Sequence, residues 1–209
     1  MAFEFSEIVA SEAHIQEIIG NPSVRAQRKQ IAQLDTHTRA FIAKCPFLVI
    51  SSCDADGRMD VSPKGDPPGF VQVLDDQTLA IPDRPGNRRA DTFRNLLQNP
   101  NVALLFLIPG KQETLRVSGT ARIVRDLWVR EPMAVAGKLP DFALIVNVRE
   151  VFFHCAKCVI RSGLWDKGAW PDVTELPSLA RALVDQAKLE QSPEEVQALL
   201  EKDARERLY

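Results

Sequence analysis

The chain has 209 residues, of which 45% are hydrophobic and 26% are charged, and its formal net charge is −2. This composition is typical of a globular protein with enough apolar material for one good core, and it excludes a surface devoted to nucleic acid or anionic lipid, because those partners require a broad excess of Lys and Arg. No stretch approaches the ~20 apolar residues of a membrane-spanning helix, and the N-terminus is acidic where a secretory leader would be basic, so we expect a cytoplasmic protein without a membrane or nucleic-acid partner.

Residues 1–46 are predicted to form an N-terminal helical arm. Ser11 is a suitable N-cap for a short helix with isoleucines on one side, and Gly20 followed by Asn and Pro ends that helix. A second helical stretch begins near Ser23 and extends to about residue 45. The pair at residues 35 and 36 can break this stretch into two pieces.

From residue 47 onward the sequence changes to short apolar or alternating runs separated by turn residues, which is typical of strands. The segment 63–69 is too rich in Pro and Gly to be regular, and Gly119 marks a candidate bulge. A short helix is expected at 92–97 and a mixed, mainly helical stretch at 128–138. Strands are expected at residues 47–50, 59–62, 70–74, 78–81, 102–108, 114–124 and 143–153.

Six or seven strands with one internal helix predict a mainly β (α+β) fold, a closed or split β-barrel with N- and C-terminal helical extensions. Residues 47–165 would form the barrel. Residues 166–209 would form a helical tail, because Ser178 can cap one helix and Ser192 begins a capping box for a second. The apolar side of these helices would pack on the barrel or on a second subunit.

The segment 81–94, with the sequence IPDRPGNRRADTFR, leads from a strand through a turn into a helix. Four of its residues are arginine, and between the first and last of these Asp91 is the only acid. Guanidinium forks, free N–H groups of a turn and the first turn of a helix all favour an oxyanion. The segment therefore predicts a phosphate site, with a solvated basic helix start as the alternative interpretation.

Four motifs, at residues 62–71, 81–89, 99–106 and 115–119, resemble in sequence and order those of the pyridoxamine 5′-phosphate oxidase-like flavoproteins. With residues 154–157 and 161–165 added, the chain is most similar to the subgroup described as FMN-dependent flavin-nucleotide-binding proteins. The resemblance covers about residue 47 to residue 165. It implies an FMN-binding split-barrel homodimer, with FMN in clefts between the subunits, that acts as an oxidoreductase on a small-molecule substrate.

The resemblance also implies site residues. In the family the flavin phosphate lies against basic residues on a strand and at the start of the following helix, and Arg88 and Arg89, preceded by Asn87, match that helix start. Arg58 or Lys64 matches a second basic position. The other implied positions are Ile81 and Pro82 beside the isoalloxazine ring, Ser62 at its polar edge, Thr114 and Arg116 from the neighbouring subunit, and Arg161 and Trp165 at the same cleft.

No Ser/His/Asp arrangement, Walker loop or Rossmann glycine fingerprint is visible, and no catalytic residue is assigned. A bound flavin would itself carry the chemistry. Two other interpretations stay open: a flavin-binding protein without turnover, serving as store, sensor or electron relay, and a split barrel that binds a deazaflavin or haem, with His154 as the haem ligand. The chain finishes in residues 206–209 rather than the Arg-Leu-x-Pro segment of true pyridoxamine phosphate oxidases, which argues against vitamin B6 oxidation.

Cys155 and Cys158 have the spacing of a metal-binding or redox pair. A structural zinc site usually needs a second pair of ligands, and four cysteines are too few and too irregular for a secreted disulfide framework. We therefore expect reduced, buried thiols that close a strand, and no metal site. The remaining candidate ligands, Cys45, Cys53, His14 and His37, have no ligand spacing.

Overall fold

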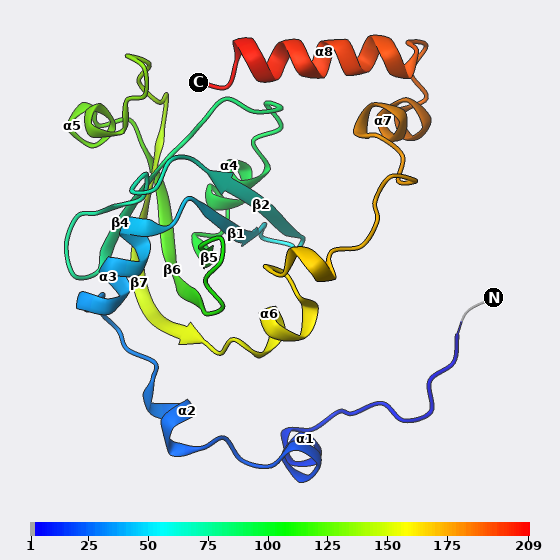
Figure 1. Cartoon of the computed structure of the whole chain (residues 1–209). Helices are drawn as coiled ribbons and strands as arrows, with labels where there is room; N and C mark the ends of the chain where they lie inside the picture. The colour runs from blue at the N-terminus through cyan, green and yellow to red at the C-terminus, as the bar shows by residue number, and fades with distance from the viewer. Residues whose placement is uncertain (1–2) are drawn as a thin grey trace.

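The computed structural model describes residues 3–209, which form a coiled antiparallel sheet with short helices around it (Figure 1). The strands are β1 (Phe47–Cys53), β2 (Met59–Gly65), β3 (Gln72–Val73), β4 (Thr78–Pro82), β5 (Asn101–Leu107), β6 (Thr114–Val124) and β7 (Ala143–His154). The helices are α1 (Glu12–Ile19), α2 (Val24–Arg28), α3 (Thr36–Lys44), α4 (Asp91–Leu96), α5 (Leu127–Arg130), α6 (Lys157–Ser162), α7 (Leu179–Ala187) and α8 (Pro193–Glu206). Two 3₁₀ turns, η1 (Glu131–Met133) and η2 (Lys167–Ala169), complete the described elements.

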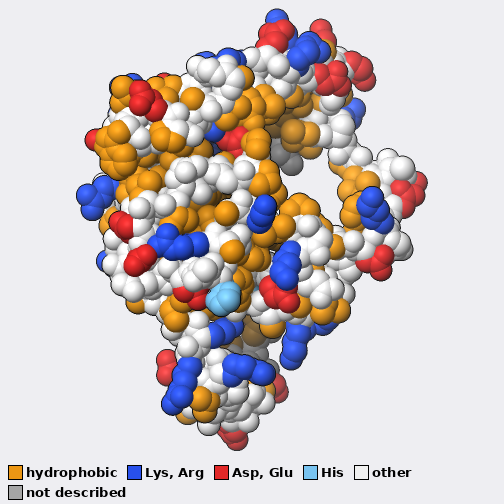
Figure 2. Space-filling view, turned by 60° about the vertical axis from the view of Figure 1, so that its left-hand side comes forward, with side chains coloured by type: hydrophobic (Ala, Val, Ile, Leu, Met, Phe, Trp, Pro, Cys, Tyr) orange, Lys and Arg blue, Asp and Glu red, His pale blue; other side chains and the backbone are white. Residues whose placement is uncertain are grey.

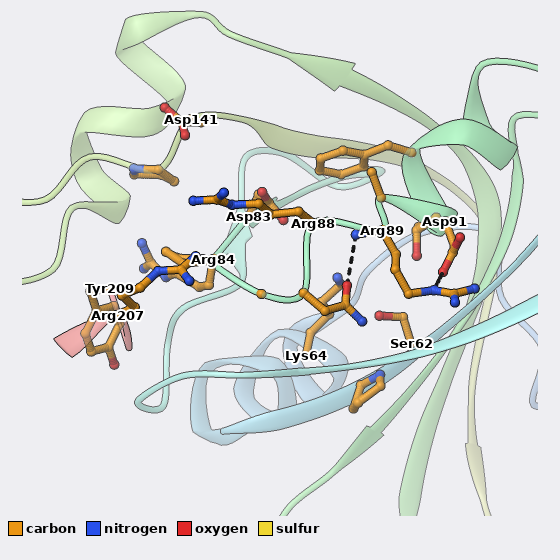
Figure 3. A pocket seen from close by; sticks show the side chains of 18 of the residues that line it. Ser62, Lys64, Asp83, Arg84, Arg88, Arg89, Asp91, Asp141, Arg207 and Tyr209 are labelled. Atoms are coloured by element: carbon orange, nitrogen blue, oxygen red, sulfur yellow. Dashed lines mark hydrogen bonds and ion pairs between the residues drawn. The ribbon is translucent and has the colours of Figure 1, made fainter. Parts of the chain in front are cut away.

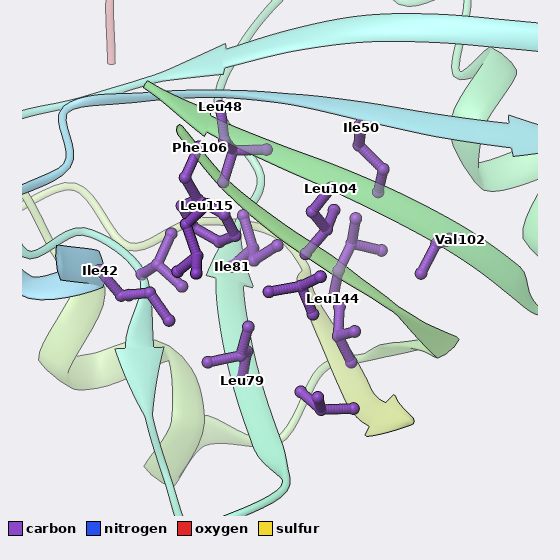
Figure 4. Close-up of a cluster of buried hydrophobic side chains, with 14 of the residues drawn as sticks. Ile42, Leu48, Ile50, Leu79, Ile81, Val102, Leu104, Phe106, Leu115 and Leu144 are labelled. Atoms are coloured by element: carbon purple, nitrogen blue, oxygen red, sulfur yellow. The ribbon is translucent and has the colours of Figure 1, made fainter. Parts of the chain in front are cut away.

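The sheet has the order β2-β1-β5-β6-β7-β4-β3 and curls around a hydrophobic core (Figure 4). Its two edge strands, β2 and β3, do not pair, so the barrel is split and not closed. The predicted mainly β, split-barrel fold is confirmed. The side chains that fill the barrel are fully buried, and they come from strands far apart in the sequence: Leu48, Ile50, Leu79, Ile81, Leu104, Phe106, Leu115, Val117 and Leu144.

Strand β6 pairs with β5 on one side and with β7 on the other, and it is the strand that the alternating pattern predicted. Its register against β7 shifts between Ser118 and Gly119, which confirms the expected bulge. A bulge bends the strand and increases its twist, which helps a sheet to curl around a core. The position of Gly119 is therefore a determinant of the barrel's curvature.

The β1–β2 hairpin is confirmed, with Ile50 opposite Ser62, but β2 is longer than predicted. The expectation that regular structure stops at residue 63 is wrong, because β2 continues through Pro63 to Gly65. An edge strand tolerates proline, since one side of it needs no ladder hydrogen bonds. As a result Ser62 and Lys64, two residues apart on one strand, lie on the same face of β2.

The second hairpin is confirmed but shorter than predicted on its first strand, since β3 contains only Gln72 and Val73. The two residues before β3, Phe70 and Val71, are buried in the core without being part of a strand. The stretch 128–138 is helical only in α5 and the 3₁₀ turn after it.

The helical ends differ in how they pack. The second predicted helical stretch is in two pieces, because α2 ends at Arg28 and α3 begins only after its cap, Asp35; α3 buries Phe41 and Ile42 against the barrel. Neither α1 nor α2 buries a side chain, and both lie away from the barrel (Figure 1). The capping box at Ser192 is confirmed as the start of α8, and α8 packs against α7. Within residues 3–209 no helix has both the length and the apolar character to cross a bilayer.

The cysteine segment differs from expectation. Strand β7 ends at His154, and Cys155 and Cys158, at and near the start of α6, are both exposed. The expectation of buried thiols is therefore wrong, because the chain leaves the barrel at the end of β7. Among residues 3–209 no group of three or more His, Cys, Asp or Glu side chains is arranged to hold a metal ion.

Candidate functional site

A pocket of about 570 Å³ lies beside the end of β4 (Figure 3). Its walls are β2, the loop between β4 and α4, the loop before β7, and the last residues of the chain. Its size falls in the range of small-molecule and cofactor pockets, about 300–1,000 Å³. The side chains labelled in Figure 3 show that it is rich in charge, with cations Lys64, Arg84, Arg88, Arg89 and Arg207 and acids Asp83, Asp91 and Asp141.

Two of these cations, Lys64 and Arg88, have no carboxylate partner within 4.0 Å among the described residues. Arg89 does pair with Asp91, at 2.7 Å, but its side chain is 70% exposed. Exposed ion pairs are weak and exchange their partners readily, so Arg89 can turn to a bound anion. Lys64, Arg88 and Arg89 are therefore the cations that β2 and the loop before α4 make available to a ligand.

Arg84 has a structural role that the sequence did not predict. Its Nε donates to Asp66 at 2.6 Å and its Nη2 donates to the Met133 carbonyl at 2.8 Å. The Asp66 side chain is 1% exposed and that of Arg84 is 16% exposed, so this ion pair is buried. One of the four arginines of the segment 81–94 is thus neutralised by a carboxylate from the loop after β2.

The backbone of the loop carries unusual conformations. Arg88 and Ala90 have φ of 60° and 56°, in the left-handed region that costs a non-glycine residue about 1 kcal/mol. The Asn87 side-chain oxygen accepts the Arg89 backbone N–H at 3.0 Å and fixes the turn. Helix α4 begins at Asp91, so Arg88 and Arg89 precede the helix and do not start it, which corrects the sequence expectation.

The acids of the pocket limit its positive character. Burial raises the pKa of the Asp83 carboxyl above its ordinary value, although the nearby Lys64 ammonium acts in the opposite direction. The Asp83 backbone N–H donates to Phe142 at 3.0 Å and ties the loop to β7. The pocket therefore offers an anion a few defined cations rather than a uniformly positive wall.

The structure brings together five of the predicted site residues. These are Ser62 and Lys64 from β2 and Asn87, Arg88 and Arg89 from the loop after β4. Ile81 and Pro82 lie at the end of β4 but are buried, and neither lines the pocket. Arg58 precedes β2 in the β1–β2 turn and does not line the pocket either.

Thr114 and Arg116 line a different cavity, an apolar groove of about 620 Å³ on the outer face of β1, β5 and β6. His154 and residues of α6 complete the groove. Arg161 and Trp165 line neither cavity, and the Trp165 indole N–H donates to the Lys111 carbonyl at 2.8 Å. One copy of the chain therefore does not bring these four predicted residues to the pocket.

His154 stands near two cations. The Lys29 ammonium and the Arg116 guanidinium lie 4.9 Å and 5.4 Å from the Phe152 ring centre, and the His154 ring lies 5.0 Å from it. Partial burial and the charges of Lys29 and Arg116 lower the pKa of His154 below its ordinary value. The imidazole is therefore neutral at neutral pH.

We expect an NMR titration to give His154 a pKa below the ordinary value of about 6.5, and Arg116→Ala to raise it. Because the folded-state pKa is the lower one, the unfolded chain takes up the proton first, and stability falls as the pH drops from about 6.5 to the folded pKa. Arg122→Ala, on the same strand but outside the groove, should leave the titration unchanged. A wild-type pKa at or above 6.5 would contradict the prediction.

Sequence reasoning missed several residues of the pocket, among them Asp83, Lys138, Asp141, Arg207 and Tyr209. Asp83 lies inside the segment 81–94, so its place beside the arginines was a usable signal. The others come from a loop and a chain end that follow the segment by many residues. Nothing in their local sequence marks them as neighbours of the pocket.

Comparison with known proteins identifies the family. The family model described as pyridoxamine 5′-phosphate oxidase matches residues 34–155, more than half of the chain. A search of curated proteins finds no match. Similar solved structures include a variant of HupZ from Group A Streptococcus (18% identity, 58% of this chain, 99% of that chain, TM-score 0.48) and General Stress Protein 26 from Bacillus anthracis (17%, 55%, 88%, 0.43). A third is HutZ, the haem storage protein of Vibrio cholerae (22%, 57%, 94%, 0.41). From the match to the family model, the chain belongs to the pyridoxamine 5′-phosphate oxidase family.

Proposed function

We propose that the protein is an FMN-binding flavoprotein, and that it acts as an oxidoreductase on a small molecule. The observation that carries the proposal is the pair of cations Lys64 and Arg88, which have no carboxylate partner within residues 3–209 and lie in a pocket of cofactor size. A phosphomonoester carries close to two negative charges, which need several fixed donors. Membership of the family supports a flavin nucleotide as the ligand that carries this phosphate group.

The residues of the pocket fit such a group. Arg88 and Arg89 carry planar guanidinium forks at adjacent positions of the loop, and Lys64 lines the same pocket from β2. Figure 3 shows Arg88 extending toward Asp83 and Arg89 toward Asp91, so a bound phosphate would be met by Arg89 only after that exposed side chain turns. Arginine can hold phosphate through two parallel hydrogen bonds, and lysine adds a point charge. Ser62, on the same face of β2 as Lys64, offers its hydroxyl to a polar edge of the flavin.

When bound, the flavin supplies hydride or single-electron transfer. The chain's own residues bind and orient the group, so the fold needs no nucleophile. The pocket is open to solvent on one copy, and Thr114 and Arg116 would reach a flavin there only from a second copy. A homodimer with shared sites is therefore part of the proposal.

Arg88→Ala combined with Arg89→Ala is predicted to weaken FMN binding at least tenfold, or about 1.4 kcal/mol, with folding retained. Between the single variants, Arg88→Ala should cost more affinity, because the charge of Arg89 is partly balanced by Asp91. Quenching of FMN fluorescence on titration with protein measures both.

Arg94→Ala is the matched control, since Arg94 is an exposed arginine on α4 outside the pocket. It should bind FMN like the wild type. Unchanged affinity in the double variant would remove the phosphate role from these arginines and overturn the proposal in its present form.

Two experiments test the nature of the ligand and of the activity. Mass spectrometry of the ligand that copurifies with the protein distinguishes FMN from a deazaflavin or haem. Addition of NADH or NADPH to FMN-loaded protein, followed at the flavin absorption band, tests turnover. Rapid bleaching supports the oxidoreductase, and no reduction by any donor favours a flavin store or electron relay.

A second candidate function is haem binding in the groove, and a specific observation favours it. His154 lies in a largely apolar groove with a lowered pKa, and a neutral imidazole is the form that coordinates metal. A Soret band in protein supplied with haem, lost in His154→Ala, would support it. Absence of the band would leave FMN as the proposed ligand.

A further inference from the structure

The last residues of the chain reach the pocket from far away in the sequence. Tyr209 donates its hydroxyl hydrogen to Asp66 at 2.7 Å, and the Arg84 guanidinium lies 5.4 Å from the centre of its ring. Lys138 donates to the Tyr209 carbonyl at 2.6 Å. Arg207 and Tyr209 both line the pocket, next to Arg84 (Figure 3).

The receiving side of this contact is rigid. The Asp66 carboxylate and the Arg84 guanidinium form an ion pair, and Arg84 also donates a hydrogen bond to the Met133 carbonyl. Of the three interacting side chains, only Tyr209 comes from outside the barrel. The Asp66–Arg84 pair is therefore a preformed seat for the tyrosine.

The C-terminal segment, α8 and the residues after it, makes few buried contacts. Within α8 only Val196 is buried, and Leu208 beside the tyrosine is 63% exposed. Figure 1 shows α8 lying across one end of the barrel rather than against the sheet. The space-filling view shows one opening through the molecule, between the main body and an outlying part of the chain (Figure 2). A segment with so few buried contacts can open without unfolding the barrel.

We propose that residues 207–209 form a closing wall of the pocket, and that Tyr209, seated on Asp66 and Arg84, retains a bound anionic ligand by keeping this wall shut. The inference rests on the proposed function, because it requires an anion in the pocket. It assigns to Tyr209 a binding role that the family resemblance did not include.

Charge links closure to binding. When the wall is shut, Arg207 joins Lys64 and Arg88 around the pocket, since its ion pair with Asp203 is exposed and can exchange like that of Arg89. An anion in the pocket therefore interacts better with the closed form than with the open form, and closure and binding stabilise each other by linkage. The hydrogen bond to Asp66 raises the pKa of the Tyr209 phenol, so the hydroxyl stays a donor at neutral pH.

The test is the rate at which FMN leaves the protein, measured by recovery of flavin fluorescence after dilution. Tyr209→Ala should release FMN at least about tenfold faster than the wild type, because it loses a hydrogen bond to a charged group and a ring contact. Tyr209→Phe keeps the ring and should give an intermediate rate. Leu199→Ala, at an exposed position of α8 outside the wall and the pocket, is the matched control and should release FMN at the wild-type rate.

Release from Tyr209→Ala at the wild-type rate would overturn the inference while leaving FMN binding intact. A second readout does not depend on FMN. Tyr209 is the only tyrosine in the sequence, so protein labelled with ring-¹³C tyrosine gives one tyrosine signal. A signal displaced from the position of an unstructured tyrosine in ligand-free protein supports the seat on Asp66, and a signal at that position overturns it.

Discussion

Asp66→Ala is expected to lower the free energy of unfolding by about 3 kcal/mol. The Asp66 side chain is 1% exposed and accepts hydrogen bonds from Arg84 at 2.6 Å and from Tyr209 at 2.7 Å. Its removal leaves the guanidinium, itself only 16% exposed, without a carboxylate in a place that water reaches poorly. Urea unfolding followed by circular dichroism measures the change as a lower midpoint at constant slope.

The exposed pair of the same pocket is the control for this prediction. Asp91→Ala removes the partner of Arg89, whose side chain is 70% exposed, and should cost less than about 1 kcal/mol. Replacing both members of the buried pair, as Asp66→Leu with Arg84→Met, should cost less than Asp66→Ala alone, since no charge is then left unpaired. Equal stability of Asp66→Ala and Asp91→Ala would show that Arg84 is solvated in the absence of its partner.

Gly119→Ala is expected to cost about 3 kcal/mol, the upper end of the range for overpacking. A Cβ atom at this position would lie 2.0 Å from the Asn147 carbonyl oxygen and 2.9 Å from its carbon. Both atoms belong to the backbone of β7, which pairs with β6 at the bulge, so the clash cannot be relieved by a side-chain rotation. The bulge would have to shift, and thermal unfolding should show a correspondingly lower midpoint.

Gly65→Ala is the matched control, because Gly65 is also a strand glycine. A Cβ atom there would lie 3.5 Å from the Pro46 carbonyl oxygen and 3.6 Å from the Phe47 ring, which are ordinary contacts. Its stability should stay within about 0.5 kcal/mol of the wild type. Similar losses for both variants would assign the effect to strand glycines in general and not to the bulge.

The sheet was predictable because its signals are local. The period-two alternation at residues 114–124 coincides with β6, and turn residues mark the ends of the hairpins. The errors arose where tertiary position overrides local composition. Proline in residues 63–65 indicated a loop, but β2 is an edge strand that accepts it. Cys155 and Cys158 follow a buried strand but lie where the chain has already left the barrel.

The pocket was predictable in part. The motifs at residues 62–71 and 81–89 place Lys64 and Arg88 together, as the structure does. The sequence shows how many arginines the segment contains, but it does not show which carboxylate neutralises each of them. Asp66, in the loop after β2, forms the ion pair with Arg84. Tyr209, 143 positions after Asp66 in the sequence, donates a hydrogen bond to the same carboxylate. Such partnerships depend on how the whole chain folds.

The left-handed backbone at Arg88 sets a limit on how this protein can evolve. Glycine at that position would relieve about 1 kcal/mol of strain and would remove the guanidinium in the same step. If Arg88 binds the phosphate as proposed, heat tolerance and anion affinity conflict at this one codon, and a lineage selected only for thermostability would lose the arginine.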